Sequence, residues 1–596
     1  MTSKRIFTLF SILIVLALLI GTFPAGAAPQ QAFKQPAPKF STAIAFDVSP
    51  ALRDLAKQAS AQGLAAAAED EPRDVRPDRG PEVVDNGFSG DGAVNQGFAD
   101  MKAAGVTAET IPGTIVNFEG ISNQDNFNLF GFRVNPPDPD GDVGPNHYVE
   151  IVNLAFAVYD KQGNLLLGPV DTGTLWANYP IEDCTDPSGD PIVLYDQFAD
   201  RWLLTQFTTR GAPYYYDCVA ISQTPDPTGP YYRYAFVTQA DAHEPGTYYF
   251  PDYPKYGVWK DSYIMTTRDF GDGGGYGISV YALEKNKMVN GQAKARAVQF
   301  FLDSDVVPIS LIGDGLLPPD VDGKTKPKND AWAPLVGTQD DDFVLYGATF
   351  DALNILELNV LWNSKPSAAF RFVDQFPVAE FDSVFPCGVV PGSLPPSSRD
   401  CLPQPGITNG SQFLDILSYR QRPTWRLAYR NFGTYEALVT NQSVEAAPGV
   451  AGVRWYEIRR VAGVYSVYQQ GTFAPGDGIH RWMGSAAMDW QGNMALGYSV
   501  VNGVDVFPGI RYTGRLAGDP LGQMTLGEGV IINGSGVQRT TNSRWGDYTS
   551  LNVDPADDCT FWYVNEYYTL AGQQSSTAGW QTRIASFKLP GCEARD

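Results

Sequence analysis

Residues 192–204 read Ile192-Val-Leu-Tyr-Asp196-Gln-Phe-Ala-Asp200-Arg-Trp-Leu-Leu204: a short apolar run, a tight turn that carries aspartates, and a second apolar run. This hairpin unit returns at 256–265, 335–345, 485–496 and 550–562, with weaker copies around Asn153 and Gly433. The turns lie near residues 153, 196, 261, 340, 433, 489 and 554, a mean spacing of about 67 residues. Seven hairpins at this spacing predict an all-β fold, a seven-bladed β-propeller.

Burial explains why such hairpins would form a ring. A single hairpin cannot hide both of its faces from water, whereas sheets packed radially around an axis cover one another's apolar faces. Uneven steps between the hairpins then correspond to loop insertions. Because loops on a rigid scaffold carry most binding and catalytic residues, we expect the functional residues near the axis and on the connections between blades.

The first residues indicate the compartment. Lys4 and Arg5 precede an apolar run at 6–20, and small residues at 25–28 follow it. This is the pattern of a secretory signal peptide over 1–28, cleaved near Ala27 or Ala28. The apolar run is too short for a membrane-spanning helix. We therefore expect a secreted, extracellular and soluble protein with no membrane insertion after cleavage.

All six cysteines lie beyond this leader, at positions 184, 218, 387, 401, 559 and 592. An even number of cysteines in an exported chain predicts disulfide bonds. Six cysteines allow fifteen pairings, and we expect the one in which sequence neighbours pair.

The net charge of the chain is −23. Such an acidic surface argues against nucleic acid and anionic membranes as partners, and it favours cations or basic partners. We expect a monomer.

The segment before the propeller is rich in Ala, Gln, Pro and charged residues, and one stretch at 49–62 has helical spacing. Its low apolar content predicts little ordered structure. We therefore divide the chain into a signal peptide at 1–28, a flexible, mostly disordered spacer with one short helical candidate at 29–112, and the propeller at 113–592. A candidate strand at 114–118 would close the ring with strands from the other end of the chain.

Several stretches carry a resemblance to a known group of proteins. They include Val143-Gly-Pro-Asn-His-Tyr-Val149, Tyr429-Arg-Asn-Phe432, His480-Arg-Trp-Met-Gly-Ser485 and Arg544-Trp-Gly-Asp-Tyr548. In these the chain resembles secreted bacterial seven-bladed β-propeller proteins of the sialidase-like propeller superfamily. The resemblance implies the fold and the exported location, and it implies no particular reaction.

Two acidic phrases suggest a metal site: Pro136-Pro-Asp138-Pro-Asp140-Gly-Asp142 and Pro318-Pro-Asp320-Val-Asp322-Gly323. Alternate carboxylates beside a glycine can place hard oxygens around one calcium ion. The alternative is that both phrases form turns leading into innermost strands. We name the five aspartates as candidate calcium ligands. Clustered carboxylates near the axis would repel one another unless a cation or arginines lay between them.

Arginines next to tryptophan, or in similar strand-rich settings, supply candidate ligand-binding residues. We name Arg430, Arg481, Arg511 and Arg544, together with Asp547. A cluster of arginines could hold a ligand carboxylate by paired hydrogen bonds. The alternative is structural: each Trp packs between blades while the arginine pairs with a nearby carboxylate.

The sequence therefore leaves two functions open. The favoured one is an extracellular binding or interaction scaffold, calcium-dependent in our hypothesis, with a glycan or a peptide as ligand. The second is a glycan-acting hydrolase of sialidase type, in which Glu566 beside Tyr567 would supply the nucleophile pair and Asp140 or Asp190 the acid. The sialidase Asp-box is absent from the sequence, and no catalytic residue can be assigned.

Overall fold

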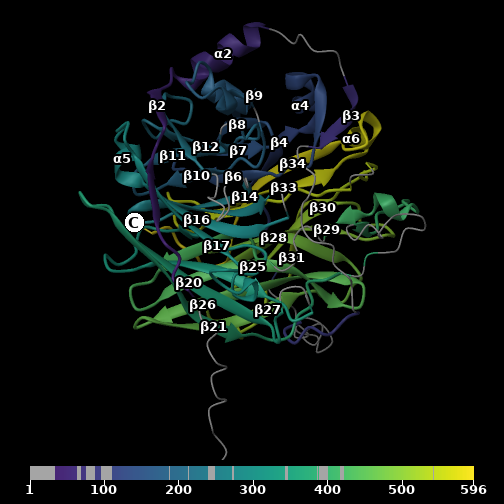
Figure 1. Cartoon of the computed structure of the whole chain (residues 1–596). Coiled ribbons are helices and arrows are strands. Elements are labelled where there is room, and N and C mark those ends of the chain that lie inside the picture. The colour runs from purple at the N-terminus through teal and green to yellow at the C-terminus, as the bar shows by residue number, and fades with distance from the viewer. Residues whose placement is uncertain are drawn as a thin grey trace, which may run out of the picture.

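The computed structural model describes residues 34–62, 69–74, 87–94, 110–186, 188–211, 214–238, 249–271, 274–342, 347–385, 387, 400–416, 422–540 and 543–595. Seven sheets form the blades of a propeller (Figure 1), which confirms the predicted fold. The signal peptide predicted at 1–28 lies outside the described residues.

The blades follow one another along the chain, and within each blade the strands run in order from the axis outward. Blade 1 is β6 (Asp140–Val143), β7 (His147–Val152), β8 (Ala155–Asp160) and β9 (Leu165–Asp171). Blade 2 is β10 (Val193–Asp196), β11 (Arg201–Phe207), β12 (Tyr216–Ser222) and β13 (Tyr231–Val237). Blade 3 is β14 (Tyr249–Val258), β15 (Ser262–Gly271), β16 (Tyr276–Glu284) and β17 (Arg296–Asp303), and blade 4 is β19 (Ala333–Gln339), β20 (Ala352–Leu361) and β21 (Ser367–Pro377).

The second half of the ring is built in the same way. Blade 5 is β24 (Thr424–Asn431), β25 (Glu436–Ala447), β26 (Val450–Val461) and β27 (Val464–Phe473), with the short strand β18 (Pro319–Val321) parallel to β24. Blade 6 is β28 (His480–Met488), β29 (Met494–Val501), β30 (Gly509–Arg515) and β31 (Glu528–Ile532). Blade 7 is β32 (Ser550–Val553), β33 (Thr560–Tyr568), β34 (Trp580–Lys588) and β4 (Val116–Ser122).

Blade 7 closes the ring with strands from distant parts of the chain. Its three inner strands come from the C-terminal part, and β4 pairs antiparallel with β34. Figure 1 shows the yellow β34 beside the blue β4. The sequence predicted such a closure from a strand at 114–118, and the observed strand begins two residues later. Shared closure removes a free sheet edge, which would otherwise invite pairing with other chains.

The segment predicted to be a flexible spacer is partly built into the propeller. β1 (Lys39–Thr42) pairs with β17 at the outer edge of blade 3, and β2 (Ala45–Val48) pairs with β13 at the outer edge of blade 2. The helical candidate forms α2 (Leu52–Gln62), which buries Leu52 and Leu55. The helix agrees with the sequence, whereas for residues 39–48 the spacer interpretation is wrong, because backbone pairing along the blade edges orders a segment whose composition alone could not form a core.

The hydrophobic core lies between neighbouring blades. One cluster, for example, joins Ile264 of blade 3, Leu353 of blade 4 and Leu427 of blade 5. Another joins Val158 of blade 1 to Leu204 of blade 2. Burying such side chains stabilises the fold by roughly 1.5–3 kcal/mol each, so each blade depends on its neighbours.

Three disulfides join sequence neighbours, as predicted: Cys184–Cys218, Cys387–Cys401 and Cys559–Cys592. The described part of the chain contains no helix long and apolar enough to cross a membrane.

Candidate functional site

The innermost strands define an axis with two ends. We call N-mouth the end at which the chain enters these strands, where Asp138, Asp190 and Asp547 stand just before β6, β10 and β32. We call turn mouth the end at which the innermost strands turn back into the second strands. Cavities there are lined by residues from the turns of blades 1, 2, 5, 6 and 7.

At the N-mouth, polar residues from blades 1, 2 and 7 are linked by hydrogen bonds. The backbone N–H of Asp547 donates to Asp138 Oδ1 (2.6 Å), and Asn153 Nδ2 donates to Asp138 Oδ2 (2.6 Å). Arg544 Nη2 donates to Asp547 Oδ2 (3.2 Å), and Tyr548 Oη donates to Asp190 Oδ2 (3.2 Å). The structure therefore brings together Arg544, Asp547 and Asp138, three of the residues singled out from sequence.

Two carboxyl groups at the N-mouth, those of Asp138 and Asp190, have raised pKa values. Burial, and then the charge of Asp547, raise the pKa of Asp138 to about 7. Burial, and then the charge of Asp138, raise the pKa of Asp190 well above its usual value. Groups that exchange protons near neutral pH are typical of acid–base sites, although structural networks perturb pKa values too.

Arg426 organises the middle of the axis. Its Nε donates to Asp320 Oδ2 (2.8 Å) and its Nη2 donates to Asp322 Oδ1 (2.6 Å). Asp142 also lies within electrostatic range of Arg426. An arginine thus lies between two of the five predicted calcium ligands and near a third, which is one of the two solutions that the sequence left open.

The remaining carboxylate of the first acidic phrase also has internal donors. Asp140 accepts from the backbone N–H of Val193 (2.8 Å) and from Trp425 Nε1 (3.2 Å). The five predicted ligands are therefore spread from the N-mouth into the middle of the axis rather than gathered at one loop, because Asp140 and Asp142 belong to strand β6. Among the described residues, the carboxylates whose oxygens lie within 4.8 Å of one another are instead Asp340, Asp341 and Asp342, after β19.

Sequence reasoning missed a second group of charges near the N-mouth. Arg268 Nη2 donates to both oxygens of Asp314 (2.7 Å each), and Arg422 Nη1 donates to Asp314 Oδ2 (3.1 Å). Lys255 is 3% exposed and packs on the Tyr253 ring, and burial lowers its pKa well below the usual value. None of these residues lies in a repeated phrase, so no local pattern in the sequence marks them.

Arg481 and Arg511 lie away from the axis. Both bind Glu528 in blade 6, at 2.8 Å from Arg481 Nε and 2.7 Å from Arg511 Nη1. Trp482 is fully buried. Arg481 therefore follows the structural alternative, in which the Trp packs between blades and the arginine pairs with a carboxylate, and Arg511 pairs with the same carboxylate. The four predicted arginines do not converge on one point.

Arg430 lies in the wall of a cavity of about 400 Å³ at the turn mouth. Its Nη1 donates to Asp558 Oδ1 (2.7 Å). Within the described part of the chain, Arg430 Nε, Arg430 Nη2 and Asp558 Oδ2 have no hydrogen-bond partner. Arg430 is only 4% exposed and Asp558 only 1%. Because an unsatisfied buried polar group costs about 1–3 kcal/mol, these three atoms require an explanation.

Other cavity walls come from aromatic side chains and from the C-terminal tail. Trp490 and Phe432 line the cavity, and the Phe432 ring stacks on Tyr435 (4.8 Å between centroids, 17° between planes). The Trp490 Nε1 donates to the Glu593 carbonyl (2.8 Å), and Arg595, also in the wall, donates its backbone N–H to the Asp557 carbonyl (3.1 Å).

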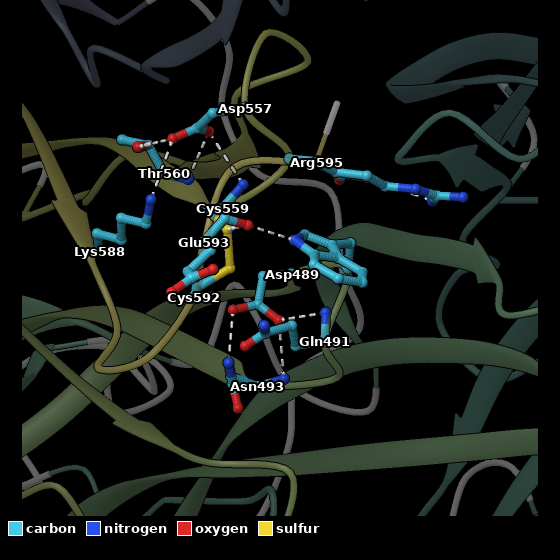
Figure 2. The surroundings of a disulfide bond; sticks show 12 residues. Asp489, Gln491, Asn493, Asp557, Cys559, Thr560, Lys588, Cys592, Glu593 and Arg595 are labelled. Carbon is cyan, nitrogen blue, oxygen red and sulfur yellow. Dashed lines mark hydrogen bonds and ion pairs between the residues drawn. A yellow bond between two sulfur atoms is a disulfide. The ribbon is translucent and has the colours of Figure 1, made fainter.

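The Cys559–Cys592 disulfide anchors this tail three residues before Arg595. Figure 2 shows the disulfide with Glu593 and Arg595 beyond it, above the turn that contains Asp489 and Asn493. The bridge holds one wall of the cavity against blade 7. We infer that the disulfide has a direct part in shaping this cavity.

A second cavity of about 390 Å³ adjoins the first, and Gly323 lines both. Tyr195, Phe198 and Lys324 form part of its wall. The turn mouth therefore offers two neighbouring hollows, each at the lower end of the size range of ligand sites.

Comparisons with known proteins give little beyond the fold. No protein-family model matches the chain, and no curated protein matches it by sequence. Among solved structures, a thermostable family-43 glycoside hydrolase is 9% identical over 70% of this chain and 97% of its own, with a TM-score of 0.24.

Two other solved structures show the same level of similarity. The N10 neuraminidase-like protein of A/little yellow-shouldered bat/Guatemala/060/2010 is 7% identical over 63% of this chain and 93% of its own (TM-score 0.27). Endo-1,5-alpha-L-arabinanase from Thermotoga petrophila RKU-1 is 12% identical over 80% of this chain and 99% of its own (TM-score 0.25). Similarity at this level transfers no site residue and no function.

Proposed function

We propose that this protein is an extracellular scaffold that binds a neutral glycan in the turn-mouth cavity. The observation that carries the proposal is the pair formed by Arg430 and Asp558. Arg430 Nε and Nη2 and Asp558 Oδ2 are buried atoms without a hydrogen-bond partner among the described residues, and Arg595 Nη1 lies 3.8 Å from Asp558 Oδ2. A ligand reaches them when the Arg430 side chain, which lines the cavity, turns toward it. A ligand with neighbouring hydroxyl groups would satisfy all three, because each hydroxyl both donates and accepts a hydrogen bond.

A ligand carboxylate fits this set less well. It can only accept, so it would leave Asp558 Oδ2 without a donor. The charged residues in the wall, Asp322, Arg430 and Arg595, together with Asp558 beside Arg430, balance in sign and give an acidic ligand no net attraction. The site therefore favours a neutral sugar over an acidic one, which differs from the carboxylate that the arginines suggested from sequence alone.

The aromatic wall supports a sugar as ligand. Trp490 and Phe432 are half-buried and lie in the wall of the same cavity as Arg430. Aromatic rings supply a large apolar surface at little cost in conformational entropy, and the apolar face of a sugar ring can pack on it. Polar groups on one wall and rings on another are typical of small-molecule sites.

The three disulfides support the extracellular location, because such bonds persist in oxidising compartments.

Calcium dependence stays a proposal for the loop and strand around Asp140, a buried carboxyl whose pKa burial raises to about 7. We expect calcium to raise the melting temperature of the wild-type protein but not that of Asp140→Asn, compared with the same proteins in chelator. An unchanged wild-type melting temperature would remove calcium from the proposal.

A glycan hydrolase of sialidase type is the second candidate, and the acidic groups of the N-mouth favour it. Against it, Tyr567 Oη donates to Glu119 (2.9 Å to each oxygen), whereas Glu566 accepts from the Gly546 backbone N–H. The nucleophile pair suggested from sequence is therefore not formed. Release of sugar from fluorogenic glycosides by the wild type but not by Asp138→Asn would favour the hydrolase.

The binding proposal is tested by a glycan array followed by calorimetry with the best neutral ligand. Arg430→Met removes both unsatisfied donors, and hydrogen bonds to a charged group contribute about 1.5–3 kcal/mol each, so we expect affinity to fall at least about 100-fold. Arg430→Lys retains the ion pair with Asp558 and should give an intermediate loss. Arg511→Met, an arginine of blade 6 outside the cavity, is the matched control and should bind as the wild type does.

Two results would overturn this proposal. One is an array on which neutral glycans do not bind. The other is unchanged affinity in folded Arg430→Met, with folding established by its melting temperature.

A further inference from the structure

We infer that the two turn-mouth cavities are adjacent subsites for one linear neutral oligosaccharide, which crosses from one to the other over Gly323. The inference rests on the proposed function, and it adds the length and the path of the ligand. Each cavity alone is small, about 400 Å³ and about 390 Å³, and Gly323 lies in the wall of both.

Gly323, where the two cavities meet, has a backbone conformation that favours a residue without a side chain. Gly323 has a φ of +76°, a conformation that side chains rarely adopt, and a Cβ at this position would overlap Arg430 Nη1. Gln197 Nε2 donates to the carbonyls of Val321 and Gly323 (2.8 Å each), and these hydrogen bonds hold the backbone of residues 321–323 in place. A glycine here thus lets a ligand pass close to the backbone without a side chain dividing the two hollows.

The second cavity has a different chemical character from the first. Its Tyr195 hydroxyl already donates to Asp200, and Phe198 contributes a half-buried ring. The Lys326 and Lys285 ammonium groups lie 5.1 and 5.7 Å from the Phe198 ring centroid, so the ring offers its remaining exposed part to a ligand. That surface suits packing of a second sugar unit after the first is fixed by Arg430 and Asp558.

Lys324 joins the two subsites physically. It lines the second cavity, and its Nζ donates to the backbone carbonyl of Arg595 (2.6 Å), a residue in the wall of the first.

When two sugar units are covalently joined, binding of the first raises the effective concentration of the second at its subsite. Affinity should therefore grow with the length of the oligosaccharide until both cavities are filled.

The test is calorimetry with a monosaccharide, a disaccharide and a trisaccharide of the best neutral sugar on the array. For the wild type we expect affinity to rise at least tenfold from the monosaccharide to the trisaccharide. Phe198→Leu retains apolar volume but removes the ring, so most of this gain should disappear while the monosaccharide affinity stays within about twofold. Phe198→Ala should behave in the same way, provided that its melting temperature shows a folded protein.

The outcomes separate this inference from the proposed function. Equal affinity for the monosaccharide, disaccharide and trisaccharide, with binding by Arg430→Met still impaired, would overturn the two-subsite inference. The proposed glycan site at Arg430 would then still hold. A chain-length gain that survives in both Phe198 variants would also overturn it. Tighter binding of a peptide than of any glycan would overturn both.

Discussion

Arg426 is the residue whose removal most directly tests the polar axis. It is 1% exposed, and Asp320 and Asp322 are 4% and 7% exposed. Its guanidinium donates to both carboxylates and, through Nη1, to the Leu551 carbonyl of blade 7 (3.2 Å). Arg426→Met leaves two buried carboxylates without their cation, and breaking a buried pair in this way costs about 3–5 kcal/mol.

The sign of the pH dependence follows from these carboxyl groups. Burial already raises the pKa of Asp320, and Arg426 opposes that rise. Without Arg426 the folded protein would hold a proton on Asp320 that the unfolded chain releases above about pH 4. The stability of Arg426→Met should therefore fall as pH rises, so its deficit relative to the wild type should be larger at pH 8 than at pH 5.

The measurement is urea unfolding of the wild type, of Arg426→Met, and of a triple variant that adds Asp320→Asn and Asp322→Asn. We expect the triple variant to regain part of the lost stability, because no buried charge is then left unpaired. A loss below about 1 kcal/mol in Arg426→Met would refute the reasoning. So would a deficit that shrinks from pH 5 to pH 8.

Three further predictions concern the disulfide, pH and the N-terminal segment. Replacing Cys559 and Cys592 by serine should weaken glycan binding at least tenfold while the far-UV circular dichroism stays that of the propeller, since the bond holds one cavity wall; wild-type affinity in this variant would contradict its role. Asp140 and many other buried carboxyls have raised pKa values and so stabilise the fold most at low pH; His480, His147 and Lys255, whose pKa values burial lowers, act in the opposite sense but are fewer. The melting temperature should therefore be higher at pH 5 than at pH 8, and the reverse order would contradict the assignment. Deleting residues 1–48 should lower the melting temperature by a few degrees, because the outer strands of blades 2 and 3 are lost; an unchanged value would restore the interpretation of a dispensable spacer.

The ring is predictable from sequence because six of the seven hairpin turns join the first two strands of a blade. The turn near Asn153 is different: it joins β7 to β8, the second and third strands of blade 1. The first strand of that blade, β6, reads Asp-Gly-Asp-Val and has no apolar run to identify it. The same acidic phrase suggests a calcium loop when only the sequence is considered. The burial of this acidic phrase depends on hydrogen bonds and on Arg426, which belongs to a strand almost three hundred residues later in the sequence.

The site was less predictable than the fold. The sequence singles out Arg430, but its partner Asp558 and the ring of Trp490 come from different blades, and no local spacing links them. Arg481 and Arg511 have the same sequence setting as Arg430 and lie in blade 6 instead. Arg511 Nε, like Arg430 Nε and Nη2, has no hydrogen-bond partner among the described residues. What separates Arg430 is its place in the wall of a cavity, which depends on tertiary contacts and not on sequence pattern.

The most direct test of the glycan site is a crystal structure with the tightest neutral oligosaccharide soaked in. Our account predicts one sugar ring against Trp490, with hydroxyl groups within hydrogen-bond distance of Arg430 Nε or Nη2 and of Asp558 Oδ2, and the next unit beyond Gly323 toward Phe198. Electron density for the sugar at the N-mouth, or on the outer edge of a blade with the turn mouth empty, would contradict it.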